Sequence, residues 1–399
     1  MSAVTKEYRW TTEYPELGSG LIPVAPYVSQ EYFEQEREKV FRHTWLNVGR
    51  ADEIPQPGDY IVRNIAVLNT SVIIARGKDG QVRAFHNVCR HRGTKLVWND
   101  KGSSTKFACN YHGWTYATDG ACIGVPEEDM FFNFCKDDYG LMQVAADVWE
   151  GFIFINMERE PKESLREYLG EIDGLLSGYP YSALPSCYAW QMDLKCNWKV
   201  IVDSQQEGYH AKMLHRRSLP GYLTNKEQPS RHALDIKLFK RHRVISYFGN
   251  TNRQPTPIET LAHRYGTSVT KREFAPENMP PGLNPTRSPN WAFDEYIIFP
   301  NFHILVFFGM YITHSVWPMT VDRAVWEARV YLVEPANFAQ HFAREYGRVL
   351  LRDAWLEDGS TLEASQEGLA SGAISHVVLQ DQELCIRHFI KVLRDYVGY

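Results

Sequence analysis

The stretch that decides the fold contains two matched loops, CRHRGTKL (residues 89–96) and CNYHGWTY (residues 109–116). Each loop offers one thiolate and one imidazole. Two such loops can hold a two-iron cluster, because thiolates suit one iron and imidazoles on the other leave the cluster less negative and raise its potential. The four candidate ligands form a C-x-H pair and, after 17 residues, a C-x-x-H pair: Cys89, His91, Cys109 and His112.

A structural zinc site is the alternative interpretation of these loops, since two cysteines and two histidines also satisfy tetrahedral zinc. Zinc fingers usually offer their cysteines together and their histidines together, whereas each loop here carries one of each. Gly93 and Gly113 would let backbone N–H groups approach cluster sulfurs. The pattern therefore favours an iron-sulfur cluster, although the module alone would equally suit an electron-transfer ferredoxin.

The residues around the loops, about 55–155, predict an all-β module. Short alternating runs such as YIVRNIAVL, SVIIARG and QVRAFHNV are separated by Gly, Asp and Asn turn signals. Before the module, residues 29–49 (SQEYFEQEREKVFRHTWLNVG) combine a Ser start with a mixed charged and apolar pattern. That pattern is typical of an amphipathic helix leading into the module.

The second half of the chain has the pattern of a separate domain that combines helices with one antiparallel sheet. Residues 161–176 look helical, and residues 191–215 pass from a strand-like run into a helix. Residues 223–287 carry many Pro, Thr and basic residues and predict long loops. Residues 294–319 and 322–335 are rich in β-branched and aromatic residues, as expected of strands. Two helices should follow, the last over about 375–397.

Composition excludes several classes of function. The formal charge of -5 and pI near 6.3 leave no basic excess of the kind that tracks a nucleic-acid backbone. No run approaches ~20 apolar residues, so no membrane span is expected, and the first residues do not look like a secretory signal. Seven cysteines, an odd number in a long chain, do not form a disulfide framework. A cytoplasmic protein is expected.

With these loops the chain resembles the large (alpha) subunits of aromatic ring-hydroxylating oxygenases, whose Rieske clusters carry this signature, and the resemblance extends over nearly the whole chain. It implies an α+β fold with an all-β Rieske [2Fe-2S] domain and a catalytic domain whose antiparallel sheet is covered by helices. It also implies that Cys89 and Cys109 bind one iron while His91 and His112 bind the other. The expected domains are an N-terminal helical segment packing on the catalytic domain (1–42), the Rieske domain (43–156) and the mononuclear iron domain (157–399).

A second set of candidate ligands lies in NWKVIVDSQQEGYHAKMLH, which is similar to the mononuclear-iron motif of that family. Two imidazoles, His210 and His215, and one carboxylate would occupy one face of ferrous iron and leave positions free for dioxygen. By resemblance the carboxylate comes from the acidic segment LEDGSTLEASQEGLASG. Asp358 is the expected ligand, with Glu357 and Asp353 as rivals.

Core histidines with ordinary hydrogen bonds are the alternative for this pair. Five residues advance an ideal helix by ~500°, so His210 and His215 share a face only if the helix is distorted between them. We therefore predict a local break in the helix.

Glu207, three residues before His210, occupies the position where aromatic-ring oxygenases usually have Asp. By resemblance this residue hydrogen-bonds a mononuclear-iron histidine, here His210, and a Rieske histidine of a neighbouring subunit, here His112. Glu at this position is similar to the branch of the family that oxidises N-methyl compounds such as carnitine. A glutamate on a helix surface is the alternative.

The resemblance also implies partners. Electrons would come from NAD(P)H through a separate reductase, with or without a ferredoxin, since this chain has no GxGxxG loop. A homotrimer is expected, and a small beta subunit is an open possibility. Basic residues near the cluster loops would steer an acidic donor, or simply form a solvated face: Arg90, Arg92, Lys95, Lys101 and Lys106.

The expected activity is O2- and NAD(P)H-dependent hydroxylation of an aromatic or hydrophobic small molecule. Oxidative N- or O-dealkylation at the same site is the alternative outcome, and a Rieske electron carrier without oxygenase activity is the alternative of another class. Aromatic residues of the predicted sheet should contribute walls around the substrate, although alternate residues along each strand must face away and belong to the core: Trp291, Phe293, Tyr296, Phe299, Phe302, Phe307, Phe308 and Tyr311.

Overall fold

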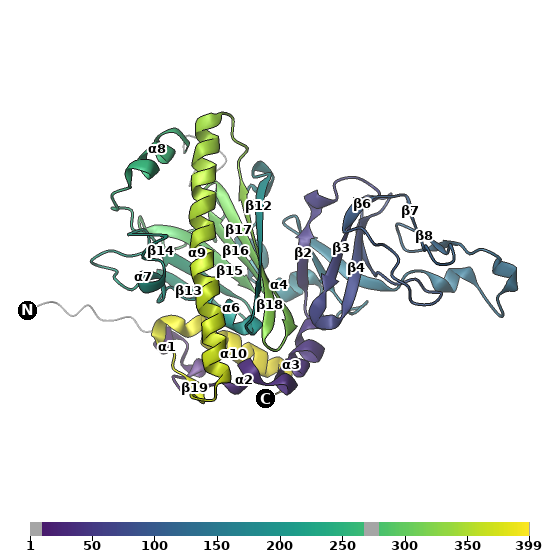
Figure 1. The fold of residues 1–399 in the computed structure, drawn as a ribbon, viewed down its shortest axis with the longest axis horizontal. Helices are drawn as coiled ribbons and strands as arrows, with labels where there is room; N and C mark the ends of the chain where they lie inside the picture. The colour runs from purple at the N-terminus through teal and green to yellow at the C-terminus, as the bar shows by residue number, and fades with distance from the viewer. Residues whose placement is uncertain (1–9, 267–278, 399) are drawn as a thin grey trace, which may run out of the picture. The chain divides into compact units, whose positions relative to one another are not determined.

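The computed structural model describes residues 10–266 and 279–398, which form two compact units (Figure 1). One unit spans residues 37–169 and contains the cluster loops. The other contains the residues from Gly170 onward together with the N-terminal segment up to Glu36. The Rieske domain expected from the sequence spans residues 43–156, so the first unit extends beyond it at both ends.

The first unit is all β apart from short helical turns and α4 (Leu165–Leu169), which agrees with the predicted module. A three-stranded antiparallel sheet, β7 (Lys106–Ala108), β8 (Thr115–Ala117) and β9 (Cys122–Gly124), carries the second cluster loop. The larger sheet is antiparallel in the order β2 (Leu46–Arg50), β11 (Phe152–Asn156), β10 (Gln143–Trp149), β5 (Val82–His86), β4 (Thr70–Arg76), β3 (Asp59–Ile65) and β6 (Lys101–Ser103).

The helix predicted over residues 29–49 is too long. Helix α3 spans Gln30–Glu36, and a π-helical turn continues it only to Phe41. Leu46–Arg50 instead form β2, which pairs with β11 in the larger sheet. Four of the five β2 residues are buried, so pairing in the sheet overrides the amphipathic pattern that favoured a helix.

The second unit contains one seven-stranded antiparallel sheet, as predicted. Residues 223–287 are not only loops, which corrects the prediction, because β13, β14 and α8 (Pro257–Gly266) lie there; residues 267–278 of this stretch lie outside the described residues. All six residues of β14 are buried, so the strand lacks the polar alternation that would have revealed it. The strand order is β12 (Ser186–Leu194), β18 (Arg323–Leu332), β17 (Met310–Thr320), β16 (Phe302–Phe307), β15 (Trp291–Ile298), β14 (Arg243–Phe248) and β13 (Asp235–Leu238).

Helices cover one face of this sheet (Figure 1). The 33-residue helix α9 (Phe338–Ala370) crosses it, and Trp355 of α9 packs against Trp190 of β12 and His314 of β17 with ring centroids 5.3 Å apart in both cases. Residues opposite each other in an antiparallel pair of strands point to the same face of the sheet. The residues that pair with Trp190 and His314 therefore also point toward α9. The other helices of this unit with more than four residues are α6 (Trp198–Gln205) and α10 (Leu384–Val397), together with α3 and α8.

Two further helix predictions need correction. The helix expected over residues 161–176 is two short helices, α4 and α5 (Ile172–Leu175), separated by Gly170 in the left-handed region at φ 56°. The last helix begins at Leu384 rather than near Ser375, because residues 376–377 form strand β19. Gly in the left-handed region interrupts the helical hydrogen bonds, which explains the first break.

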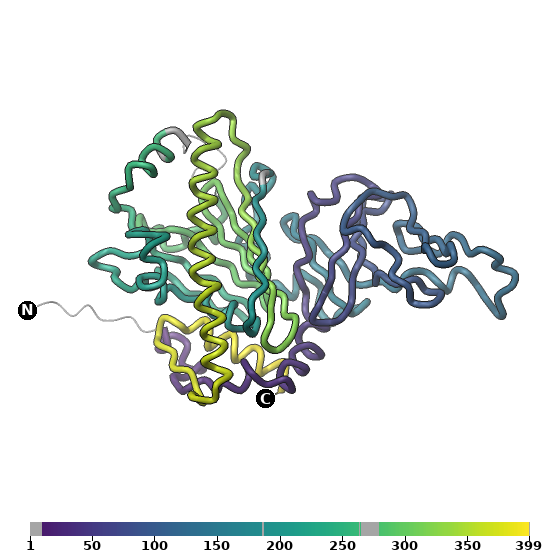
Figure 2. Tube along the Cα trace, in the orientation of Figure 1, coloured from purple at the N-terminus to yellow at the C-terminus, as the bar shows by residue number. Residues whose placement is uncertain are grey.

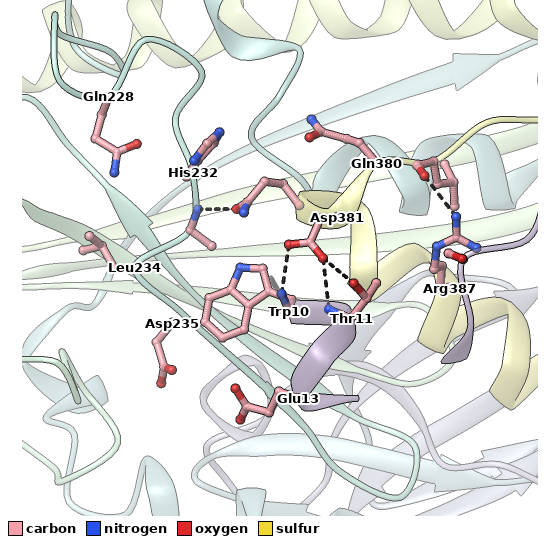
Figure 3. A pocket seen from close by; sticks show the side chains of 14 residues that line it. Trp10, Thr11, Glu13, Gln228, His232, Leu234, Asp235, Gln380, Asp381 and Arg387 are labelled. Carbon is pink, nitrogen blue, oxygen red and sulfur yellow. Dashed lines mark hydrogen bonds between the residues drawn. The ribbon is translucent and has the colours of Figure 1, made fainter. Parts of the chain in front are cut away.

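The N-terminal segment docks on the catalytic unit, where the first and last parts of the chain lie side by side (Figure 2). Strand β1 (Ile22–Pro23) pairs with β19, and Asp381 accepts hydrogen bonds from the backbone N–H groups of Trp10 and Thr11 at 2.9 Å (Figure 3). These residues border a polar cavity of about 870 Å³ that contains none of the predicted site residues. The short helices here are α1 (Trp10–Glu13) and α2 (Ala25–Val28).

A fully buried ion pair fixes α3 to α6. Lys199 Nζ lies 2.7 Å from Glu36 Oε1, and Trp198 Nε1 donates to the same carboxylate at 2.9 Å. Removing one partner of such a pair costs about 3–5 kcal/mol, because the other charge stays buried. The N-terminal segment thus stabilises the helix that leads into the candidate iron site.

Within the described residues, no helix is both long enough and apolar enough to cross a membrane.

Candidate metal centres

A break in the helix places the two predicted histidines. Helix α6 ends at Gln205, and the single turn α7 (Ala211–Leu214) lies between His210 and His215. His210 keeps helical backbone angles, but His215 leaves them with ψ 18°. The helix is thus interrupted before His210, at residues 206–210, whereas the residues between the two histidines keep one helical turn and depart from it only at His215.

Three potential ligand atoms converge there. His210 Nε2 lies 3.2 Å from His215 Nε2, and Asp358 Oδ1 of α9 lies 3.7 Å from the first and 3.3 Å from the second. Among the described residues, this is the only group of three His, Cys, Asp or Glu side chains whose ligand atoms lie within 4.8 Å of one another. The structure thus brings together His210, His215 and the acidic residue favoured from the sequence.

The hydrogen bonds of these histidines leave a gap that a cation would fill. His210 Nδ1 contacts Glu207 Oε1, and His215 Nδ1 lies 3.1 Å from Glu357 Oε2. A carboxylate at Nδ1 keeps the proton on that nitrogen, so both Nε2 atoms present lone pairs. They face Asp358 Oδ1, a buried atom with no hydrogen-bond partner among the described residues. Two imidazole lone pairs and one carboxylate fit a ferrous ion with open positions.

The two rival carboxylates, those of Glu357 and Asp353, make other contacts. Glu357 contacts Nδ1 of His215, not the Nε2 atom that faces Asp358, and also accepts a 2.6 Å hydrogen bond from Ser218 Oγ. Asp353 pairs with Arg352 on the outer side of the helix, where both side chains are nearly half exposed. Burial disfavours a charged His215, but Asp358 and Glu357 outweigh it and raise the pKa of this histidine. The site is therefore electrostatically attractive to a cation.

Glu357 and Asp353 offer a matched pair of variants. We expect Glu357→Gln to weaken iron binding by roughly 10–100-fold, because outer partners of a metal-bound histidine typically contribute that much. Asp353→Asn should leave iron binding unchanged. Iron retained per chain after dialysis against graded chelator measures both; loss of iron in Asp353→Asn with retention in Glu357→Gln would exchange the roles assigned to these residues.

Glu207 is not an ordinary surface glutamate. Its side chain is only 9% exposed, and besides His210 Nδ1 it accepts hydrogen bonds from the backbone N–H groups of Tyr209 and His210, the latter at 3.2 Å. The carboxylate is thus fixed within its own loop and fixes the ring of His210. It also borders a cavity of about 320 Å³ that includes Asp358.

The cluster loops have the same backbone geometry. The N–H group of Cys89 donates to Thr94 O and that of Cys109 to Trp114 O, both at 2.8 Å. The glycine four residues after each cysteine, Gly93 or Gly113, donates back to the cysteine carbonyl at 3.0 and 2.9 Å with φ near 75–78°. Only glycine adopts this left-handed geometry easily, so each loop can fold tightly around its thiol.

The two candidate histidine ligands of the cluster lie against each other, and the two candidate cysteines are buried. The rings of His91 and His112 lie 4.6 Å apart, and His91 stacks on Trp114 at 5.0 Å. His91 Nδ1 is buried and has no hydrogen-bond partner among the described residues. Cys89 and Cys109 are buried and not in a disulfide, whereas His112 is exposed. Two buried thiols with two imidazoles above them suit a [2Fe-2S] cluster.

A single zinc ion fits these residues poorly. Zinc holds its ligands at about 2.0–2.3 Å in a tetrahedron, which keeps the ligand atoms within about 4 Å of one another. Within the described parts of the chain, no three of these four side chains bring their ligand atoms within 4.8 Å, whereas His210, His215 and Asp358 do. The wider spacing of these four side chains favours a group larger than a single metal ion, such as a [2Fe-2S] cluster.

The predicted aromatic residues are divided between the two faces of the sheet, in line with the expectation that alternate residues must face away from a substrate. Phe307 and Phe308 line an apolar cavity of about 530 Å³ under α9. Tyr296 instead donates to Gly282 O at 2.8 Å, and Tyr311 packs against Tyr181. Alternation along each strand sends neighbouring side chains to opposite faces, so part of the set belongs to the core.

Asp203 is a site residue that the sequence interpretation missed. It accepts a 2.6 Å hydrogen bond from Tyr27 Oη, and it borders the 320 Å³ cavity together with Glu207 and His210. Burial raises the pKa of Asp203 to about 7. A signal was available in the sequence, because Asp203 lies four residues before Glu207 in a run predicted to enter a helix, where such residues would share a face.

Comparisons with known proteins agree on the architecture. Residues 182–399 match the family model of the ring hydroxylating alpha subunit (catalytic domain), and residues 44–135 match the Rieske [2Fe-2S] domain. The glycine betaine monooxygenase oxygenase subunit of Chromohalobacter salexigens is 33% identical over 198 residues, or 50% of this chain and 44% of that protein. Biphenyl 2,3-dioxygenase subunit alpha of Rhodococcus jostii is 34% identical over 201 residues, or 48% of this chain and 43% of that protein.

These alignments span less than half the length of the two curated relatives. Among solved structures, a quaternary ammonium Rieske monooxygenase, described in connection with carnitine oxidation by gut microbiota and inter-subunit electron transfer, superposes with a TM-score of 0.75. It covers 94% of this chain and 95% of that chain at 22% identity, which supports the fold.

Proposed function

Because the chain belongs to the family of ring-hydroxylating oxygenase alpha subunits and carries a Rieske domain ahead of the catalytic domain, we propose that it is the terminal oxygenase of a multicomponent Rieske system. The observation that carries the proposal is the convergence of His210 Nε2, His215 Nε2 and Asp358 Oδ1 in the same chain as the two cluster loops. An electron carrier needs the cluster loops but not this second group. Cys89, Cys109, His91 and His112 would hold the [2Fe-2S] cluster, and the three converging side chains would hold ferrous iron.

When bound, the cluster supplies single electrons and the ferrous iron supplies the site of dioxygen activation. The residues of this chain orient that site. Glu207 and Glu357 fix the two imidazole rings through Nδ1, so that neither histidine can rotate away from the ion. The cavity lined by Phe307 and Phe308 would offer a mostly apolar surface to a substrate on the side of the sheet that α9 covers.

Monooxygenation consumes protons as well as electrons: RH + O2 + 2 e⁻ + 2 H⁺ gives ROH + H2O. Asp203 is suited to deliver one of them, because a carboxyl with a pKa of about 7 is protonated in part of the molecules near neutral pH. Its Oδ2 accepts from Tyr27 Oη, and it borders the same cavity as Glu207 and Asp358. We propose that protons reach the site along this cavity.

We further propose that electrons cross between subunits of a homotrimer. His112 is exposed at the tip of its loop, and large apolar side chains are exposed on the same unit at Trp98, Tyr111 and Phe132. On the catalytic unit, Tyr209 and Met213 are exposed beside Glu207 and His210. Apolar surface on both sides is typical of an interface, and Glu207 would bridge His210 to His112 of a neighbouring copy. The separate reductase or ferredoxin using NAD(P)H, the beta subunit and the cytoplasmic location stay predictions.

Two reaction outcomes follow from the same site. Hydroxylation of an aromatic or hydrophobic compound is supported by the apolar cavity and by the likeness to a biphenyl dioxygenase subunit. Oxidative N-demethylation, in which a hydroxylated methyl group leaves as formaldehyde, is supported by glutamate at position 207 and by the likeness to monooxygenases of glycine betaine and quaternary ammonium compounds.

Oxygen uptake with isotopically labelled dioxygen tests the proposal and separates the outcomes. The reduced, iron-loaded protein would be given glycine betaine, L-carnitine or biphenyl with a supplied reductase and NADH. Substrate-dependent oxygen uptake with label in a ring product means hydroxylation, and formaldehyde with a demethylated amine means dealkylation. A protein with both metal sites filled that reoxidises at the same rate with every compound and yields no product would support the electron carrier instead.

A further inference from the structure

Arg231 is a buried cation that forms no ion pair with any residue in the described parts of the chain. It is 8% exposed, and its one hydrogen bond to a described residue runs from Nε to Phe248 O at 3.5 Å, near the limit for such a bond. No carboxylate oxygen of a described residue forms an ion pair with it. A buried charge ordinarily needs both pairing and hydrogen bonds, so a guanidinium left in this state is unusual for a purely structural residue.

The side chain of Arg231 runs beside the candidate iron site. A Cβ atom added at Gly208, the residue after Glu207, would lie 2.7 Å from Arg231 O and 3.3 Å from Arg231 Cδ. Arg231 therefore occupies the space that a side chain at position 208 would need. Burial lowers the pKa of Arg231, and this shift is opposed by the charges of Tyr247 and Glu295 and, more weakly, by those of Glu207 and Asp358. The guanidinium thus lies within electrostatic reach of both site carboxylates.

Aromatic residues continue from Arg231 to the apolar cavity. The guanidinium lies 4.6 Å from the ring centroid of Tyr247 and 5.4 Å from that of Phe293. Phe293 packs against Phe307 at 4.8 Å, and Phe307 lines the 530 Å³ cavity. Tyr247 Oη donates to Gln205 O at the end of α6. Arg231 is therefore joined by contacts both to the loop of Glu207 and His210 and to the wall of the cavity.

Glu295 is a buried acid that interacts electrostatically with Arg231 but forms no ion pair with it among the described residues. The carboxylate of Glu295 instead lies 2.8 Å from His303 Nδ1, and burial raises the pKa of Glu295, while the charge of Arg231 opposes this shift. Burial lowers the pKa of His303 to about 3, so this histidine adds no positive charge beside Glu295.

The backbone of Arg231 has a left-handed φ of 50°, a geometry that costs energy for a residue other than glycine.

We propose that Arg231 anchors a carboxylate group of the substrate, which makes the substrate a small organic carboxylate whose apolar part extends toward the iron and the aromatic wall. The inference rests on the proposed function and specifies its substrate class. Guanidinium and carboxylate groups pair through two parallel N–H···O bonds, which fix orientation as well as position. The stacking on Tyr247 and Phe293 holds the plane of the guanidinium before a ligand arrives.

Calorimetric binding to the iron-loaded protein without oxygen tests the anchor independently of turnover. The probes are two pairs that differ in the carboxylate, benzoate with benzamide and glycine betaine with choline. The variants are Arg231→Gln and Arg231→Lys, with Arg323→Gln as the control, since Arg323 is exposed and pairs with Asp193 at the end of the sheet.

We expect the wild type to bind the carboxylate of at least one pair at least about tenfold tighter than its partner probe, the range of one charge-assisted hydrogen bond. Arg231→Gln should remove that preference while leaving the binding of benzamide or choline within about twofold, Arg231→Lys should keep part of it, and Arg323→Gln should match the wild type. Equal loss of both members of a pair, loss of iron in Arg231→Gln, or no carboxylate preference in the wild type would overturn the anchor. Carboxylate binding that depends on Arg231 without any oxygen-dependent product would keep the anchor and overturn the oxygenase.

Discussion

Replacing His210 with alanine is expected to remove the mononuclear iron and to abolish product formation while leaving the Rieske spectrum intact. His210 would supply one of three protein ligands, and its loss leaves one imidazole and one carboxylate. The effect on activity should exceed the roughly 100-fold that loss of an outer partner can cost. Iron per chain, the visible spectrum of the reduced protein and product yield measure the three consequences.

His341→Ala is the matched control for this variant, because His341 is an exposed histidine of α9 away from the site. It should retain all iron and full activity. Product formation by His210→Ala at the wild-type rate would mean that the catalytic iron, if there is one, lies elsewhere. Loss of the Rieske spectrum in the same variant would mean that the substitution disturbs folding rather than one ligand.

Replacing Glu207 with glutamine is expected to leave both metal sites filled but to slow oxidation of the reduced cluster when substrate and dioxygen are present. The neutral amide can still accept a hydrogen bond from His210 Nδ1, but it loses the charge that fixes the ring and that would attract His112 of a neighbouring copy. We expect at least a tenfold decrease in the single-turnover rate, within the range that outer-sphere partners contribute.

Stopped-flow absorbance of the Rieske cluster in a single turnover measures this rate. Glu367→Gln, an exposed glutamate of the same helix as Asp358, is the control and should match the wild type. Cluster oxidation by Glu207→Gln at the unaltered rate would remove Glu207 from the electron path. A decrease accompanied by loss of iron would assign Glu207 to metal retention instead.

The cluster loops could be predicted from the sequence because their information is local. Each pair of ligands, Cys89 with His91 and Cys109 with His112, lies within four residues, and the glycine of each tight turn lies in the same loop. Family matches over residues 44–135 and 182–399 confirm the predicted Rieske and catalytic architecture. The antiparallel sheet of the second unit was also predictable, since its strands are long and rich in β-branched residues.

The remaining site residues depend on tertiary contacts that no local pattern contains. Asp358 was favoured over Glu357 by resemblance alone. In the structure Asp358 points toward the two Nε2 atoms and Glu357 toward His215 Nδ1, because neighbouring residues on a helix point about 100° apart. Arg231 lies in a stretch interpreted as loops, and only the packing of β14 and β15 places aromatic rings beside its guanidinium. The strand β2 was mistaken for helix because its pairing with β11 involves residues more than a hundred positions away.

Whether one chain holds both a Rieske cluster and a mononuclear iron can be measured as metal and acid-labile sulfide content per chain, with electron paramagnetic resonance spectra before and after dithionite. We expect about three irons and about two sulfides, because a [2Fe-2S] cluster contributes two of each and the second site contributes one iron. A Rieske signal should appear on reduction. Two irons with two sulfides, unchanged after incubation with ferrous iron, would reduce the protein to an electron carrier, and zinc without sulfide would contradict the account altogether.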